Sequence, residues 1–374
     1  DAPFYCGFGL LQVFIISSYL IEKMLSRKTL GETIGFMLHM VNANAALFVP
    51  MAIVWFFMEG RPLPGSFLLL HSVITWMKLL SYLHANSDYR TRDPMQSTVA
   101  LVKDQDEFGA QLSYPSNITL SNIYYFWFAP TLTYQIAFPR SARVRPTKVA
   151  TLIIRIIVVA CFLAFLVGQI IAPSLDSLAR DTAENEGLFT PHIAAHYLTK
   201  LSLASTYAWL LFFYLFFHLY LNLFAEILRF GDRVFYRDWW NASEVASYWR
   251  LWNTPVHYWL VRHVYFPCLR NGMSKSMSNF IVFFISAVMH EVLVSVPFHM
   301  IGYWSFLGMM GQIPLVAITK YIDKKIPGSS IGNAMFWLSF CIVGQPMAIL
   351  LYCVDYFTMK NSASCEMVDG VCSS

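Results

Sequence analysis

Long apolar runs separated by short polar stretches dominate the chain and predict membrane-spanning helices. Runs of about 18 or more mostly apolar residues are long enough to cross a bilayer as helices. The sequence holds eight such runs, at residues 7–23, 33–58, 66–85, 149–172, 197–226, 279–301, 303–320 and 333–357. No internal repeat or low-complexity tract divides them. The pattern therefore predicts an all-α polytopic membrane protein, with one membrane domain over residues 1–374.

The composition agrees with a membrane protein. Apolar residues make up 57% of the chain and charged residues only 13%, a balance that excludes a water-soluble globule. The net charge of +4 follows from basic residues gathered on one side of the membrane, so a nucleic-acid partner is not indicated. The seven cysteines contain no CxxC spacing, and we expect no metal site.

Lysine and arginine near the ends of the runs predict the orientation, because these residues favour the cytosolic side. They gather after the first, third, fifth and seventh runs, whereas the loop at 173–195 and the tail at 358–374 are acidic. We therefore expect the segments 86–148 and 227–278 in the cytosol and both ends of the chain in the lumen. Residue 1 is Asp and no signal peptide precedes the first run, so we expect an absent leader and a further upstream span, about nine spans in all.

This topology has two consequences for modification. Cys365 and Cys372 fall in the predicted lumenal tail, where an oxidising compartment permits a disulfide, and the sequence leaves open whether they are bridged. The glycosylation sequons that begin at Asn117 and Asn241 lie on the predicted cytosolic side. We expect neither asparagine to be glycosylated.

Both cytosolic segments are unusually aromatic. The stretch YYFWFAP at 124–130 is too short and too rich in Tyr and Trp for a span, and indicates an interfacial or re-entrant segment. The segment 227–278 mixes aromatic and basic side chains in an amphipathic pattern, which predicts helices in the headgroup plane. Ordinary anchoring explains any single ring, but less easily the polar residues among them, Asp238, Asn241 and Asn253.

An ionisable pair, His290 and Glu291, lies inside the apolar run 279–301. Such residues are costly in a span and usually face a protein interior or a cavity. Position 294 is Val, so the pair lacks the second histidine of a zinc protease, and no GxSxG elbow supports a catalytic triad. A lone imidazole in an apolar chamber is suited to taking a proton from an alcohol. A histidine that bonds a neighbouring helix for packing is the alternative.

Helical spacing gives the two residues different surroundings. His290 shares a face with Ser286, while Glu291 points about 100° away. Two intramembrane amides, Gln312 and Gln345, are candidate donors to a thioester carbonyl and its developing oxyanion. Hydrogen bonding between helices is the alternative role for each amide.

Several motifs resemble the membrane-bound O-acyltransferase family. FYRDWWN at 235–241 resembles the motif of its diacylglycerol and sterol branches, and SAVMHEVLVSVP at 286–297 resembles their catalytic histidine segment. LSYPSNITLSNIYYFWFAPTL at 112–132 and FPRS at 138–141 resemble the diacylglycerol branch, the type 1 acyl-CoA:diacylglycerol acyltransferases. GMMGQIPL at 308–315 and GQP at 344–346 agree with that branch. The resemblance extends over residues 5–357.

The resemblance implies a reaction and a set of roles. Diacylglycerol and a long-chain acyl-CoA would give triacylglycerol and CoA without a cofactor, with His290 as the general base and Glu291 in support. Around acyl-CoA and the reaction centre it places Trp252, Asn253, Tyr265, Ser286, Met309, Gln312 and Gln345. The motif residues expected to hold the cytosolic helix at the CoA entrance are Phe235, Tyr236, Asp238, Trp239, Trp240 and Asn241.

The polar half of the CoA site is expected in the basic segment 227–278. Arg262, Arg270 and Lys275 are candidate partners for the CoA phosphates, and positive-inside bias explains their charges almost as well. Relatives carry a further basic residue at the position of Asn279. The resemblance also implies residence in the endoplasmic reticulum membrane and assembly as a homodimer or homotetramer.

Other functions compete with this one. A sterol O-acyltransferase is the nearest alternative, because FYRDWWN and the histidine helix do not separate the two acceptors. Wax or retinyl esters are conceivable side products of an apolar chamber. A proton-coupled transporter, with His290 and Glu291 as relay, belongs to a different class, but no inverted repeat supports it. A lipid scaffold without catalysis would tolerate loss of His290. The sequence fixes neither the acyl-chain preference nor any regulation by an upstream region.

Overall fold

The computed structural model describes residues 2–91, 113–185 and 189–367, apart from the side chains of 342–343 and 360–367. Within these ranges the chain is helical, and its β-structure amounts to an isolated bridge between Arg140 and Phe230. This agrees with the predicted all-α class. The side chains of Cys365 and Cys372 lie outside the described part, so their pairing stays a prediction.

Seven helical stretches in the described chain are long and apolar enough to cross a membrane, which confirms a polytopic membrane protein. Three are single helices near the N-terminus, α1 (Ala2–Ser26), α2 (Glu32–Phe57) and α3 (Pro62–Thr91), and a fourth is α13 (Lys275–Ser295). The other three contain π-helical turns: α6 (Pro146–Leu166) with η1 (Val167–Ile171) and α7 (Ala172–Glu184), α8 (Pro191–Phe213) with η2 (Tyr214–Tyr220) and α9 (Leu221–Ile227), and α16 (Ile331–Leu338) with η5 (Ser339–Gly344) and α17 (Gln345–Met367).

The predicted run 303–320 is divided into two helices, α14 (Trp304–Met310) and α15 (Gln312–Lys325), which meet at Gly311. Pro314 lies in the first turn of α15 and has no N–H to donate to the carbonyl of Met310, which interrupts the helical hydrogen-bond ladder there. The run 279–301 also ends early, at Ser295, because Pro297 follows. Apolar length alone did not reveal these breaks.

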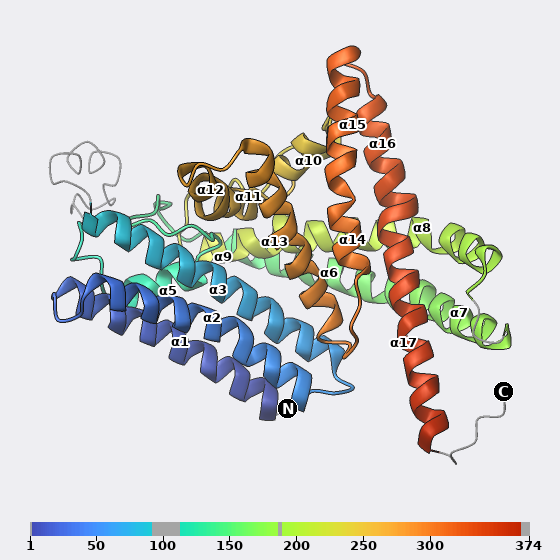
Figure 1. Cartoon of the computed structure of the whole chain (residues 1–374), viewed down its shortest axis with the longest axis horizontal. Helices are drawn as coiled ribbons and strands as arrows, with labels where there is room; N and C mark the ends of the chain where they lie inside the picture. Colours follow the sequence, from blue (N-terminus) through green and yellow to red (C-terminus); the bar gives the residue numbers. More distant parts are fainter. Residues whose placement is uncertain (1, 92–112, 186–188, 368–374) are drawn as a thin grey trace.

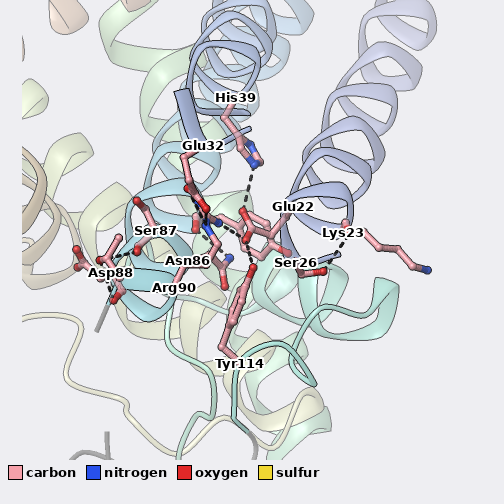
Figure 2. Close-up of polar contacts among 12 residues, drawn as sticks. Glu22, Lys23, Ser26, Glu32, His39, Asn86, Ser87, Asp88, Arg90 and Tyr114 are labelled. Atoms are coloured by element: carbon pink, nitrogen blue, oxygen red, sulfur yellow. Dashed lines mark hydrogen bonds and ion pairs between the residues drawn. The ribbon is translucent and has the colours of Figure 1, made fainter. Parts of the chain in front are cut away.

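The first three helices form a bundle that encloses a polar cluster (Figure 1, Figure 2). Glu22 on α1 is fully buried and lies 3.2 Å from Nε2 of His39. It also accepts hydrogen bonds from Arg90 and from the Tyr114 hydroxyl, the latter at 3.0 Å. A buried carboxylate without such partners would be strongly destabilising. The cluster therefore fixes α1, α2 and α3 against each other and against the chain around Tyr114.

Ser18 hydrogen-bonds Nδ1 of His39 at 3.1 Å, so Ser18, His39 and Glu22 lie in the order of a hydrolase triad. Ser18 is nevertheless buried beneath the helices, and its hydroxyl cannot meet a substrate. The guanidinium of Arg90 also engages the carboxylate. This arrangement is therefore structural.

The aromatic segment 124–130 belongs to a short helix, α5 (Leu120–Phe128), whose nine residues cannot cross a bilayer. The buried Lys78 of α3 donates from Nζ to the carbonyls of Phe126, Trp127 and Ala129, at 2.8, 2.8 and 2.7 Å. These carbonyls are at the end of α5, where the helix leaves acceptors unpaired. Lys78 thus anchors α5 to the three-helix bundle.

The segment 227–278 folds into short helices, and none of those described is long enough to span. They are η3 (Trp239–Asn241), α10 (Val245–Leu251), α11 (Thr254–Leu260), η4 (Val261–Tyr265) and α12 (Phe266–Arg270). Figure 1 shows α10, α11 and α12 gathered beside the upper end of α13. The α15–α16 connection also lies at the top of that view, whereas α1 begins and α17 ends in its lower part.

Gly332 in α16 allows a close backbone contact that a side chain would prevent. A Cβ atom there would lie 2.0 Å from the carbonyl oxygen of Ser243. We expect Gly332→Ala to destabilise the protein by about 1–3 kcal/mol or more, because α16 must move off the FYRDWWN region. Thermal unfolding of the purified protein in detergent measures this effect.

Gly308 in α14 is a matched control, since a Cβ atom there meets nothing within 4 Å. Gly308→Ala should melt at or slightly above the wild-type temperature. Equal melting temperatures for the two variants would contradict the packing argument.

Candidate active site

His290 lies on α13, whose start is capped by the Ser274 hydroxyl, which accepts the N–H of Met277 at 3.2 Å. Nδ1 of His290 is 2.7 Å from the carbonyl oxygen of Ser286 and 3.4 Å from the Ser286 hydroxyl. A carbonyl only accepts, so Nδ1 carries the proton and Nε2 is a bare acceptor. The spacing of four residues predicted this contact.

Nε2 of His290 has no hydrogen-bond partner in the described chain, and the side chain is accessible rather than packed over. The packing interpretation of this histidine required a bond to a neighbouring helix. The imidazole instead bonds its own helix, and its unprotonated Nε2 has no partner among the described residues. This is the form that a general base needs.

Glu291 points away from His290 and joins three segments. Its carboxylate accepts from the Tyr352 hydroxyl on α17 at 2.8 Å and from the backbone N–H of Phe306 on α14 at 3.0 Å. The Ser295 hydroxyl, one turn along α13, donates to it as well. These donors hold α13, α14 and α17 together at the level of the histidine.

The surroundings of Glu291 leave little room for change. The Tyr352 hydroxyl also accepts the N–H of Ser305 at 2.8 Å. A Cβ atom on Gly302 would lie 2.6 Å from the Tyr352 ring. One turn along α17, Asp355 accepts from the indole N–H of Trp304 at 2.7 Å. The sequence did not single out Tyr352, Trp304 or Asp355, because their pairing depends on how α17 packs.

The two candidate amides differ in their contacts. Gln312 donates from Nε2 to the carbonyl of Gly308 in the preceding turn at 3.2 Å. Oε1 of Gln345 is buried without a hydrogen-bond partner in the described chain. The Gln312 bond thus joins α15 to the adjacent α14, which is the contact that the alternative role expects, whereas no hydrogen bond of Gln345 to another helix is found in the described chain. Met309, also implicated by the resemblance, is buried on α14.

Aromatic contacts join α13 to the neighbouring elements of the site. Phe283 meets Trp249 of α10 edge to face at 6.2 Å, and Phe284 meets Phe306 of α14 at 5.8 Å. The element η4, which carries Tyr265, also packs against α13. The elements α10, η4 and α14, which adjoin or carry Trp252, Tyr265 and Met309, therefore contact the histidine helix.

Trp252 and Asn253 lie at the junction of α10 and α11. Asn253 caps α11, because its Oδ1 accepts the N–H of Val256 at 3.2 Å. Trp252 packs against Phe217 and Tyr248, with ring centroids at 5.6 and 6.1 Å. Asn253 thus has a structural role that fixes the start of α11, whatever its contact with a substrate.

The FYRDWWN motif contacts η2, α11 and α16. Phe235 and Trp239 are buried, and the hydroxyl of Tyr236 bonds Nδ1 of His218 on η2 at 2.7 Å. The backbone of Phe235 accepts from Thr254 on α11 at 3.1 Å, and the Trp240 carbonyl accepts from Asn333 on α16 at 2.8 Å. Asp238 precedes η3 and Asn241 ends it. The motif thus connects η2, α11 and α16 through these contacts.

The three candidate phosphate partners are not alike. Arg262 of η4 donates to the carbonyl of Tyr134 at 3.4 Å, so part of its hydrogen bonding is already used. Arg270, at the end of α12, and Lys275, at the start of α13, are exposed. Among described residues no group of three or more His, Cys, Asp or Glu side chains could hold a metal ion.

A buried hydrogen-bond chain joins η4 to α3. The Ser81 hydroxyl accepts the N–H of Tyr134 at 2.9 Å and meets Nε2 of His263 at 2.8 Å. Nδ1 of His263 meets Nδ1 of His84 at 2.9 Å. Burial, with His84 and Arg262 nearby, lowers the pKa of His263 to about 3. His263 is therefore neutral at cytosolic pH.

The lowered pKa of His263 predicts a loss of stability in acid. Unfolded, this side chain binds a proton below its ordinary pKa of 6.5, while the folded protein resists protonation down to about 3. The folded state binds fewer protons in that window, so stability falls as pH falls from about 6.5 towards 3. His263→Gln should reduce the difference in melting temperature between pH of about 7.5 and about 5.5. His196→Gln, an exposed histidine on α8, should leave that difference unchanged; an equal reduction in both variants would contradict the assignment.

Comparison with known proteins gives consistent results. The model of the membrane-bound O-acyltransferase family matches residues 29–354. Diacylglycerol O-acyltransferase 1 of Corylus americana is 40% identical, covering 94% of this chain and 63% of its own length. Diacylglycerol O-acyltransferase 1C of Glycine max is 38% identical, over 96% of this chain and 68% of its own. Diacylglycerol O-acyltransferase 1 of Arabidopsis thaliana is 38% identical, over 97% and 66%. The chain thus spans about two thirds of the length of these curated relatives.

Proposed function

The chain belongs to the membrane-bound O-acyltransferase family, and we propose that it transfers a long-chain acyl group from acyl-CoA to diacylglycerol. The products would be triacylglycerol and CoA. The observation that carries the proposal is the similarity to diacylglycerol O-acyltransferases across nearly all of this chain. It favours diacylglycerol over a sterol as the acceptor.

In this mechanism His290 is the general base. Its Nδ1 proton is held by the Ser286 carbonyl, which leaves the Nε2 lone pair to take the proton of the diacylglycerol hydroxyl. The hydroxyl oxygen attacks the thioester carbonyl carbon and forms a tetrahedral oxyanion. When the carbon–sulfur bond breaks, the CoA sulfur receives the proton from the imidazolium. No acyl-enzyme forms, so no activated serine or cysteine is needed.

A buried amide would stabilise the oxyanion in this scheme. Gln345 is the stronger candidate, because its carboxamide has no hydrogen-bond partner in the described chain, which leaves the Nε2 hydrogens available to donate to the oxyanion. Gln312 already bonds Gly308. An amide donor preorganised in a dry site stabilises developing charge more than water does.

Glu291 has a positioning role in this proposal. Its bonds to Tyr352 and Phe306 tie α13 to α17 and α14, so they set the place of the histidine relative to the walls of the chamber. A shift of about 1 Å in a reacting group can lower a rate about a hundredfold. A carboxylate at this point therefore affects catalysis without touching the substrate.

We place the CoA entrance on the cytosolic side. Arg270 and Lys275 are exposed near the start of α13 and can meet phosphates, while the acyl chain enters the membrane. Residence in the endoplasmic reticulum, a lumenal C-terminus and assembly as a homodimer or homotetramer complete the proposal and rest on the family resemblance.

We expect His290→Gln to lower acyl transfer by about 10²–10⁴-fold, the usual contribution of a general base. Radiolabelled oleoyl-CoA with diacylglycerol, added to purified protein, measures triacylglycerol formed. The variant should stay folded and bind acyl-CoA. His196→Gln is the control and should retain activity. Unchanged activity in His290→Gln would show that the imidazole is not the base.

The same assay identifies the acceptor. Cholesterol offered in place of diacylglycerol should give little ester. Formation of cholesteryl ester with no triacylglycerol would assign the chain to the sterol branch and would leave the role of His290 as a base intact.

Glu291→Gln should lower activity by about tenfold or more and also lower the melting temperature. The amide places an N–H group among donors from Ser295, Phe306 and Tyr352, and removing an acceptor from buried donors costs about 1–3 kcal/mol. Tyr352→Phe should reproduce both effects in part. A Glu291→Gln protein that melts like wild type but is inactive would instead indicate a direct chemical role for the carboxylate.

A further inference from the structure

Basic side chains form a stripe along one face of α6. Arg145 is the N-cap residue of the helix. Lys148 follows it by three residues, and Arg155 follows Lys148 by seven, so the three side chains share a face. Leu152, between them on that face, is buried. The stripe therefore lies along the side of α6 that packs against η2 and α9, and Figure 1 shows α6 beside these elements.

Positive charge exceeds negative charge at the N-terminal end of α6. Glu226 of α9 is fully buried and accepts from Arg145 at 2.8 and 2.9 Å and from Arg233 at 2.7 Å. Lys148 lies 3.8 Å from the same carboxylate. Three cations thus surround one anion, and the Arg145 and Lys148 side chains remain 50% and 40% exposed.

Arg155 adds a charge that no described residue balances. It is exposed and forms no ion pair or hydrogen bond with the described chain. It lies nine residues beyond Pro146, about 14 Å along the helix axis. Arg155 follows Lys148 by seven residues, two helical turns, which places the two charges on the same side of α6.

Positive-inside bias explains basic residues at the end of a span, but it does not require one this far into it. An ionisable residue within a span usually meets a partner, and its side chain leans towards the helix N-terminus, here towards Lys148. Val158, an exposed apolar residue three positions after Arg155, borders it on the same face of α6. A ligand here must join a negative headgroup to hydrocarbon.

We propose that the stripe of Arg145, Lys148 and Arg155 binds the phosphate headgroup of an anionic phospholipid, with the acyl chains along the apolar face of α6. The phosphate meets Lys148 and Arg155, while Glu226 holds Arg145 and Arg233 in place. His218 bonds Tyr236 of the FYRDWWN motif at 2.7 Å. The lipid site therefore adjoins the segment that orders the cytosolic helices.

Titration of the purified chain with phosphatidylglycerol in neutral detergent, followed by native mass spectrometry, tests this site. Each juxtamembrane charge changes the affinity for an anionic lipid about fivefold. Arg155→Gln should therefore weaken the first binding event about fivefold, and the double variant with Lys148→Gln and Arg155→Gln about 25-fold. Arg155→Lys keeps the charge and should bind within about twofold of wild type. Phosphatidylcholine should bind all proteins weakly and alike.

Arg143→Gln is the matched control, because this exposed residue lies on the same side but outside the stripe. Its binding should equal that of wild type. Equal losses in Arg143→Gln and Arg155→Gln would overturn the site in favour of a diffuse surface charge, and unchanged binding in Arg155→Gln would overturn it outright. Inorganic phosphate lacks acyl chains and should displace phosphatidylglycerol only at much higher concentration; displacement at equal concentration would overturn a lipid ligand in favour of a free anion.

The CoA phosphates are the other anions that this chain would meet. The KM for oleoyl-CoA, measured with the same variants, separates the two ligands. An unchanged KM with weakened phosphatidylglycerol binding supports the lipid site. A KM raised in parallel with the binding loss would overturn it and assign the stripe to CoA.

Discussion

Hydrocarbon offers no hydrogen bonds, so polar groups at membrane depth must find partners inside the protein. That constraint accounts for the positions of several buried ionisable side chains. Lys78 donates hydrogen bonds to three carbonyls at the end of α5. The Glu22 carboxylate contacts His39, Arg90 and Tyr114. Each of these groups fastens segments that are distant in the sequence. The polar residues of the spans therefore determine which helices adjoin.

The same constraint gives His290 and Glu291 their different roles. Adjacent residues on a helix point about 100° apart, so one reaches α14 and α17 while the other faces away from them. Glu291 is saturated with donors, and such a group is rigid. His290 has one nitrogen bonded and one free among the described residues. In the proposed mechanism, a rigid neighbour and an unsatisfied nitrogen provide what a base requires, a fixed position and a free lone pair.

Apolar length predicted most of the spanning helices, because it follows directly from the cost of burying polar groups in lipid, whereas the orientation that loop charge indicates stays a prediction. Apolar length missed the division at Gly311, since a hydropathy window counts Pro314 as one residue among many and not as a missing donor. The contact of His290 with Ser286 was predictable because it lies within one helix. Tyr352 and Asp355 were not, because nothing in a single sequence states that α17 packs against α14. Local geometry can be derived from spacing, whereas pairing between helices depends on the whole fold.

Charge balance separates structural clusters from groups that remain available to ligands. Glu22 is matched by Arg90, and Glu32 also binds that arginine, so the cluster of α1–α3 is closed. The stripe on α6 is different. Glu226 is a single anion that faces three cations, and Arg155 has no partner in the described chain. An arginine in a span retains its charge, and it is stable there only if an anion or water reaches it. The exposed Val158 beside it keeps that face in contact with lipid, whose headgroups supply anions. Charged groups at membrane depth need partners. Within the Glu22 cluster the protein supplies them, whereas the α6 stripe requires an anion from the membrane surface.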